Sequence, residues 1–92
     1  MIDLVLGSPT RIKIVMALWL FGEMNMSELA RRVGATQEAV SEQLEQLVKY
    51  GVVEVKYVGR VRLYKLSSDP AIRRLAEAFV EAEGALAASG PQ

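Results

Sequence analysis

A small residue, a glycine and a β-branched residue follow one another at the spacing that a tight turn between two packed helices requires. Ala30 is small where the helices approach each other, Gly34 follows four residues later, and Val40 follows after six more. Glycine adopts the left-handed backbone of such a turn without the steric penalty that a Cβ atom brings. The spacing therefore predicts a helix-turn-helix unit over residues 27–50.

Helix start signals indicate where each helix begins. Ser8, Ser27, Thr36 and Asp69 have side chains that accept hydrogen bonds from the first free N–H groups of a helix. Proline follows both Ser8 and Asp69, and it suits the first helical position because its missing N–H would have no partner there anyway. The predicted helices span residues 10–21, 28–33, 37–50 and 70–87.

The apolar residues of segment 52–66 alternate with polar ones, whereas the preceding helix has a helical period. Gly59-Arg60 suits a two-residue hairpin turn, since glycine supplies the positive φ that the turn needs. The resulting register pairs Val53 with Leu66, Val55 with Tyr64, and Glu54 with Lys65. One face of the hairpin is then apolar and the other carries opposite charges, so we expect an antiparallel hairpin over residues 52–66 that forms a wing.

These elements predict a mainly α fold with a small β-hairpin, of class α+β. The architecture is a winged helix-turn-helix in the order α-(β)-α-α-β-β-α. The strand in parentheses is one short extended segment at residues 23–26. A chain of 92 residues has room for a single core, so we expect one domain over residues 1–92. The longest apolar run, residues 14–21, is too short for a membrane span, and we expect a cytoplasmic protein.

The chain contains neither cysteine nor histidine. Disulfides, thiolate nucleophiles, imidazole bases and the usual soft metal ligands are therefore excluded. No cluster of carboxylates suggests a metal site either. The sequence predicts that the protein is not an enzyme and that it has no cofactor and no bound metal.

Several motifs together resemble the ArsR-type (arsenical-resistance-repressor-like) transcriptional regulators of bacteria and archaea. They are Ser8-Pro9-Thr10-Arg11-Ile12, Met26-Ser27-Glu28-Leu29-Ala30, Gly34-Ala35-Thr36-Gln37, Val40-Ser41, Leu44, Leu47, Gly51-Val52-Val53 and Gly59-Arg60. The resemblance covers about residues 8–66. It implies a dimeric repressor whose helix 37–50 lies in the major groove of DNA, with the hairpin as wing and both chain ends in the dimer interface.

Two departures from that family concern metal sensing. Metal-sensing members carry cysteines in or beside the segment that matches residues 23–29, where this chain has Met24, Asn25 and Met26. Other members use histidine on the last helix, which this chain lacks. The resemblance therefore implies a member that does not sense metals in the family's usual way. Met24 and Met26 either pack as flexible apolar side chains or imitate a soft copper(I) site.

The candidate DNA contacts fall into two groups. Base contacts are expected from the exposed side of the helix start, at Gln37, Glu38, Ser41 and Glu42. Backbone contacts are expected from Thr36, Arg11, Arg31 and Arg32 and, on the wing, from Tyr57, Arg60 and Arg62. A glutamate can accept a hydrogen bond from the amino group of cytosine. The alternative, which the sequence favours for each Glu, is a solvated helix face.

Apolar residues at the two ends of the chain exceed what one small core needs. We expect residues 1–7 and 70–87 to form dimerisation segments. The interface residues would be Ile2, Leu4, Val5, Trp19, Ile72, Leu75, Phe79 and Val80. In the alternative, helix 70–87 folds back on its own domain.

The charge distribution leaves two functions open. The net charge is zero, but helix 37–49 is acidic and the hairpin is basic. The first hypothesis is a homodimeric, sequence-specific regulator of transcription that binds palindromic double-stranded DNA. The alternative is a winged-helix module for protein–protein interaction, with weak or no DNA binding.

Overall fold

The elements of the computed structural model follow the order that the sequence predicted, with one short helix added at the start. The structure describes residues 2–89, without the side chains of Asp3 and Leu4. The elements are α1 (Ile2–Leu6), α2 (Pro9–Phe21), α3 (Met26–Val33), α4 (Gln37–Lys49), β1 (Val53–Val58), β2 (Val61–Leu66) and α5 (Pro70–Ser89). The winged helix-turn-helix prediction is confirmed. Among the described residues, no helix is long and apolar enough to cross a membrane.

Side-chain caps fix most of the helix starts. Ser8 accepts a hydrogen bond from the N–H of Arg11 at 3.5 Å, and Thr36 accepts one from Ala39 at 3.1 Å, as predicted. The predicted cap Ser27 is wrong. Asn25 caps α3 instead, since its Oδ1 accepts from the N–H of Glu28 at 2.9 Å, and α3 therefore begins two residues earlier than expected.

The hairpin forms in the predicted register. Val53 pairs with Leu66, Glu54 with Lys65, and Val55 with Tyr64. The short extended segment expected at residues 23–26 forms a single β-bridge, in which Met24 and Tyr64 exchange backbone hydrogen bonds of 2.9 and 3.1 Å. This bridge ties the entrance of the helix-turn-helix unit to the wing.

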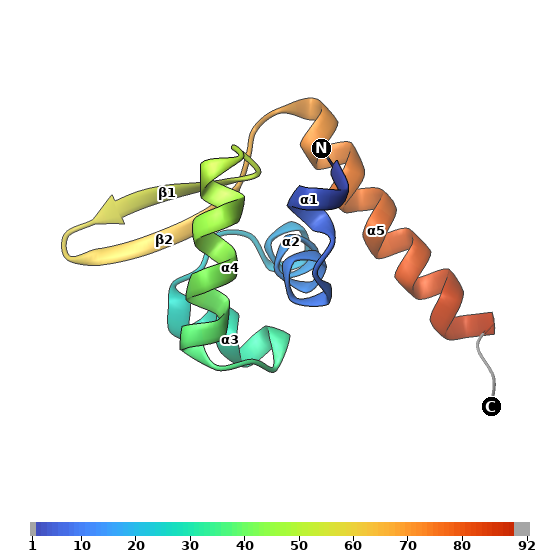
Figure 1. The fold of residues 1–92 in the computed structure, drawn as a ribbon, viewed down its shortest axis with the longest axis horizontal. Helices are drawn as coiled ribbons and strands as arrows, with labels where there is room; N and C mark the ends of the chain where they lie inside the picture. Colours follow the sequence, from blue (N-terminus) through green and yellow to red (C-terminus); the bar gives the residue numbers. More distant parts are fainter. Residues whose placement is uncertain (1, 90–92) are drawn as a thin grey trace.

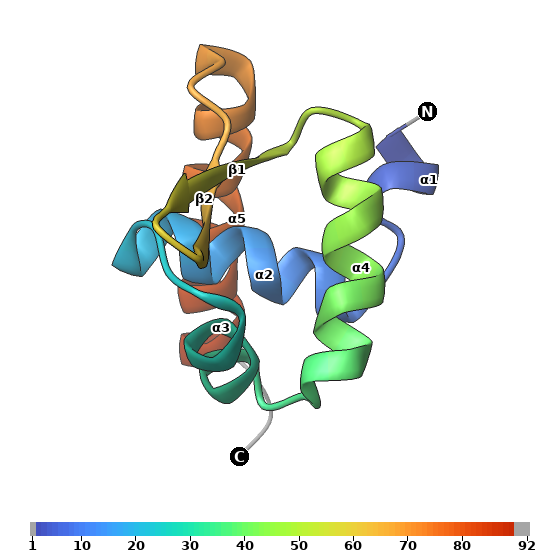
Figure 2. The ribbon, with the colours of Figure 1, turned by 90° about the vertical axis from the view of Figure 1, so that its left-hand side faces the viewer.

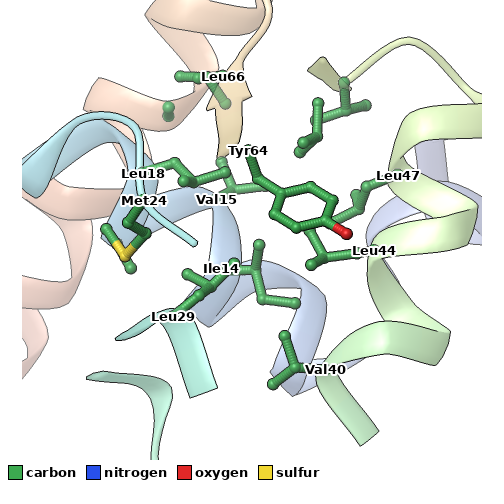
Figure 3. Close-up of a cluster of buried hydrophobic side chains, with 14 of the residues drawn as sticks. Ile14, Val15, Leu18, Met24, Leu29, Val40, Leu44, Leu47, Tyr64 and Leu66 are labelled. Carbon is green, nitrogen blue, oxygen red and sulfur yellow. The ribbon is translucent and has the colours of Figure 1, made fainter. Parts of the chain in front are cut away.

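Helix α2 crosses the centre of the molecule and is surrounded by the other elements (Figures 1 and 2). In Figure 1 the hairpin projects to one side, beyond α4, while α5 leaves the body on the other side. The core lies where α2, α3, α4 and β2 meet, with Ile14, Leu29, Leu44 and Tyr64 facing one another (Figure 3). This core holds α4 and the wing on the same side of α2.

The turn between α3 and α4 depends on the backbone of Gly34. Its φ is +72° and its ψ is 36°, in the left-handed region, and its N–H donates to the carbonyl of Ala30. Nothing lies within 4 Å of the place that a Cβ atom would take. The cost of a side chain at this position is therefore conformational and not steric.

We expect Gly34→Ala to lower the free energy of unfolding by about 1–2 kcal/mol, because alanine is strained in this conformation. A urea titration measures the change. Gly84→Ala is the matched control, since Gly84 lies in α5 with equally open space and an ordinary φ. That control should raise stability by about 0.5–1 kcal/mol. If both substitutions raised the free energy of unfolding, or both lowered it, the left-handed backbone assigned to Gly34 would be contradicted.

Candidate nucleic-acid interface

Helix α4 presents a polar face to solvent. One side of the helix is buried in the core through Val40, Leu44 and Leu47, so the opposite side is exposed to solvent. The four predicted base-contacting residues, Gln37, Glu38, Ser41 and Glu42, are all exposed there. The structure thus brings them together on the first two turns of α4, from which side chains can reach into a groove of DNA.

The wing carries two arginines, of which Arg62 lies beside α4 and lines a cleft together with Ser41 and Glu45. Arg60 lies in the hairpin turn and Arg62 on β2, and both are exposed. Tyr57 is the cross-strand partner of Arg62, and the guanidinium carbon lies 5.8 Å from the centre of its ring. The hydroxyl of Tyr64 and the nearby Tyr57 raise the pKa of Arg62 above its usual value. As in other arginines, the guanidinium is charged at physiological pH.

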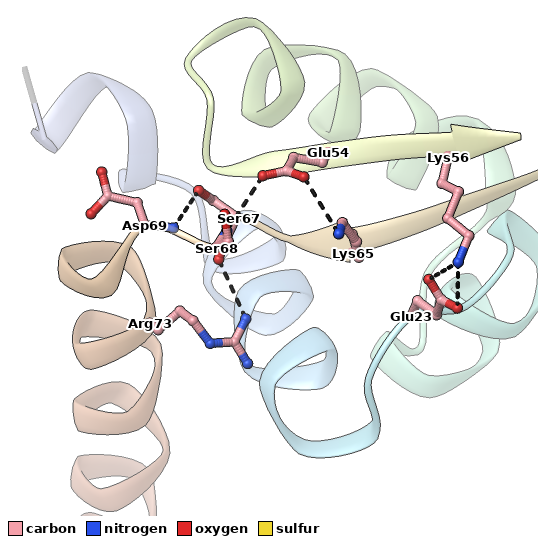
Figure 4. Close-up of polar contacts among 8 residues, drawn as sticks. All are labelled: Glu23, Glu54, Lys56, Lys65, Ser67, Ser68, Asp69 and Arg73. Atoms are coloured by element: carbon pink, nitrogen blue, oxygen red, sulfur yellow. Dashed lines mark hydrogen bonds and ion pairs between the residues drawn. The ribbon is translucent and has the colours of Figure 1, made fainter.

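The cations of the hairpin differ in their partners. Nζ of Lys56 lies 3.2 Å from Oε1 of Glu23, and Nζ of Lys65 lies 3.6 Å from Oε1 of Glu54 (Figure 4). Within residues 2–89, no carboxylate forms an ion pair with Arg60 or Arg62. The positive charge that the wing can offer to another molecule is therefore concentrated on these two arginines.

A shallow cleft of about 230 Å³ separates α4 from the wing. Ser41, Glu45 and Val48 line it from α4, whereas Val55 and Arg62 line it from the hairpin. The face of α4 and the wing are consequently continuous, and one extended ligand can contact both.

The other predicted backbone contacts have different surroundings. Thr36 is exposed but caps α4, and Arg31 is exposed on α3. Arg32 lies 3.3 Å from Glu28 and 3.9 Å above the ring of Phe21. Arg11 is half-buried and hydrogen-bonded between helices, a position that no sequence pattern revealed.

The residues predicted for a dimer interface occupy α1, α2 and α5. Ile2 is exposed, Val5 is buried, and the side chain of Leu4 lies outside the described part of the chain. The other five, which are Trp19, Ile72, Leu75, Phe79 and Val80, are half-buried.

The first half of α5 folds back on α2 through Ala76, which is fully buried, whereas residues 81–89 are all exposed. Arg73 lies with its guanidinium carbon 5.2 Å from the centre of the Trp19 ring.

Met24 is buried in the core and Met26 packs against it in part. The backbone bridge to Tyr64 fixes Met24 in this place. Both observations agree with packing by flexible apolar side chains.

Residues 8–55 match the family described as bacterial regulatory protein, arsR family. The match covers α2, the helix-turn-helix unit and the first three residues of β1. The chain belongs to the ArsR family. The family and the winged helix-turn-helix fold make it a DNA-binding regulator of transcription and not an enzyme. The resemblance inferred from the sequence is confirmed.

Solved structures of ArsR-type regulators are similar over most of the chain. The antimony-specific transcriptional repressor AntR is 30% identical, with a TM-score of 0.73 over 88% of this chain and 73% of that protein. The transcriptional repressor BigR from Xylella fastidiosa is 27% identical, with a TM-score of 0.75 over 96% and 82%. The homodimeric winged helix-turn-helix domain of Mb0332 from Mycobacterium bovis is 24% identical and has the same fold, with a TM-score of 0.74 over 92% and 76%.

Proposed function

We propose that this ArsR-family protein binds palindromic double-stranded DNA as a homodimer and regulates transcription from that site. In this proposal, helix α4 lies in the major groove, and the wing contacts the phosphate backbone of the DNA or its adjacent minor groove. The observation that carries this proposal is the pair of wing arginines without a carboxylate partner among the described residues, one of which, Arg62, shares a cleft with Ser41 of α4. Phosphates are the natural partners of such guanidinium groups.

The proposed contacts divide by chemistry. Gln37 and Ser41 meet base edges, and Glu38 and Glu42 accept hydrogen bonds from cytosine amino groups where they meet them. The residues proposed to hold phosphates are Thr36, Arg31, Arg32, Tyr57, Arg60 and Arg62. Residues 27–50 thus form the helix-turn-helix unit of one domain, and residues 52–66 form its wing. Since the chain has neither cysteine nor histidine, we propose that binding needs no metal ion.

Unpartnered apolar surface supports the homodimer. A hollow of about 350 Å³ between α1, the end of α4 and the start of α5 is lined by apolar side chains, and Ile2 at its rim is 60% exposed. The second half of α5 projects from the body (Figure 1). Residues 1–7 and 70–87 are therefore the proposed dimerisation segments, and a two-fold axis there would give palindromic half-sites.

Selection of bound sequences from a random pool of duplexes tests the proposal. A homodimer with α4 in the major groove should recover an inverted repeat, with half-site centres about one helical turn apart or a multiple of it. Recovery of no duplex at low salt would overturn DNA binding. Recovery of a single, asymmetric half-site would overturn the symmetric dimer and keep the DNA contact.

We expect Ile2→Glu to dissociate the dimer, because the charge would be buried in the interface without a partner. Sedimentation at micromolar concentration should show about 20 kDa for the wild type and 10.1 kDa for the variant. Val58→Glu is the matched control, because Val58 is similarly exposed but lies at the tip of the wing, and it should remain dimeric. A dimeric Ile2→Glu variant would place the interface elsewhere.

The acidic side of α4 favours a second candidate function. Glu38, Glu42 and Glu45 are exposed and would oppose phosphates, which agrees with a winged-helix module that binds protein. The salt dependence of binding separates the two functions, since only a DNA complex releases condensed counterions in proportion to its phosphate contacts.

A further inference from the structure

Arg11 joins three helices at one point. It lies in the first turn of α2, and its Nε donates a hydrogen bond of 2.6 Å to Oε1 of Gln43 on α4. Its Nη1 donates another, of 3.1 Å, to the backbone carbonyl of Val5 in α1. The guanidinium therefore lies between α1 and the helix that carries the proposed base contacts.

The geometry of this contact favours a structural use of the charge. Arginine has its donors in a rigid planar fork, so two acceptors held by one guanidinium are fixed relative to each other. Hydrogen bonds to a charged group are stronger than neutral ones, and partial burial protects them from competing water. Gln43 lies between the exposed Glu42 and the buried Leu44, on the side of α4 that turns toward α2.

We infer that Arg11 is a positioning residue, which orients α4 for DNA through Gln43 and does not itself hold a phosphate. The inference rests on the proposed function, because it assumes that α4 enters the groove. When the Arg11–Gln43 bond is removed, α4 samples other orientations, and binding must then select the productive one. The affinity falls by at most the strength of the lost bond, which for a charged donor corresponds to about 10- to 150-fold, and we expect the lower end of this range because the bond is only partly buried.

The salt dependence of binding distinguishes this role from the phosphate contact that the sequence suggested. Loss of a phosphate contact lowers the slope of log K against log salt by about 0.9. Loss of a positioning bond leaves the number of phosphate contacts unchanged, so the affinity falls while the slope stays the same. A smaller folded fraction would also weaken the apparent binding at an unchanged slope, so thermal melting of each variant measures the folded fraction separately.

The experiment is a double-mutant cycle of Arg11→Ala and Gln43→Ala. The probe is the duplex that the wild-type protein selects from a random pool, titrated at salt concentrations between about 50 and 200 mM. Each single variant should bind about tenfold more weakly with an unchanged slope. The double variant should bind no more weakly than Arg11→Ala alone, since Arg11→Ala already removes the bond to Gln43. Lys13→Ala, which removes an exposed cation two residues further along α2, is the control and should change neither quantity.

Three results would overturn the positioning role. These are a reduced slope in Arg11→Ala, single losses that add up in the double variant, and an unchanged affinity in Gln43→Ala. Since Gln43 is a neutral residue, its variant tests the bond even if Arg11→Ala melts early. Failure of the wild type to bind any duplex would overturn the proposed function itself, and is thereby distinct from failure of this inference.

Discussion

Leu29→Ala should lower the free energy of unfolding by about 3 kcal/mol. The side chain of Leu29 is completely buried and lies between α2 and α3, next to Ile14 (Figure 3). Truncation removes apolar area from the core and leaves a cavity that rigid neighbours on two helices cannot fill. A domain of this size has a total stability of only about 5–15 kcal/mol, so the melting temperature should drop by more than about 10 °C.

Leu86→Ala provides the same chemical change on the surface. Leu86 is 67% exposed on the second half of α5, so its truncation should change the free energy of unfolding by less than about 0.5 kcal/mol. Both variants are measured by urea titration at one protein concentration, because a dimer contact of Leu86 would make its effect concentration-dependent. Equal effects of the two substitutions would show that α3 does not pack on the core as described.

The fold was predictable where local chemistry and pattern agree. The register of the hairpin followed from residue types alone, because only one alignment puts Val53 opposite Leu66 and also Glu54 opposite Lys65. The cap of α3 was predicted wrongly because Asn25 and Ser27 are both good N-cap residues, and the choice between them depends on which side chain reaches a free N–H. The five residues of α1 gave no helix signal, since so short a segment owes its helix to packing on α2.

The candidate site was predictable in part. Exposed positions on α4 follow from the helical period, because Val40, Leu44 and Leu47 define the buried side. The partners of the charged residues do not follow from any period. Lys56 meets Glu23 across 33 positions of sequence, and Arg11 meets Gln43 across 32. Such pairs depend on how the elements pack, and they decide which cations remain for DNA.

Arg60→Ala combined with Arg62→Ala should weaken binding to the selected duplex by about 60-fold at about 0.1 M salt. Each lost phosphate contact removes about 0.9 from the slope of log K against log salt, so two contacts remove about 1.8. The effect is large because neither arginine has a carboxylate partner within residues 2–89, so no ion pair has to be broken before a phosphate binds. A binding titration over a series of salt concentrations measures both numbers.

Lys56→Ala combined with Lys65→Ala is the matched control, because it removes two positive charges from the same hairpin. Both lysines already have a glutamate partner, so this pair should leave the slope nearly unchanged. An equal loss of slope in the two double variants would mean that the wing acts through its overall charge and not through direct contacts. A normal slope in the arginine variant, with DNA still bound, would remove the wing from the interface and leave α4 to carry it alone.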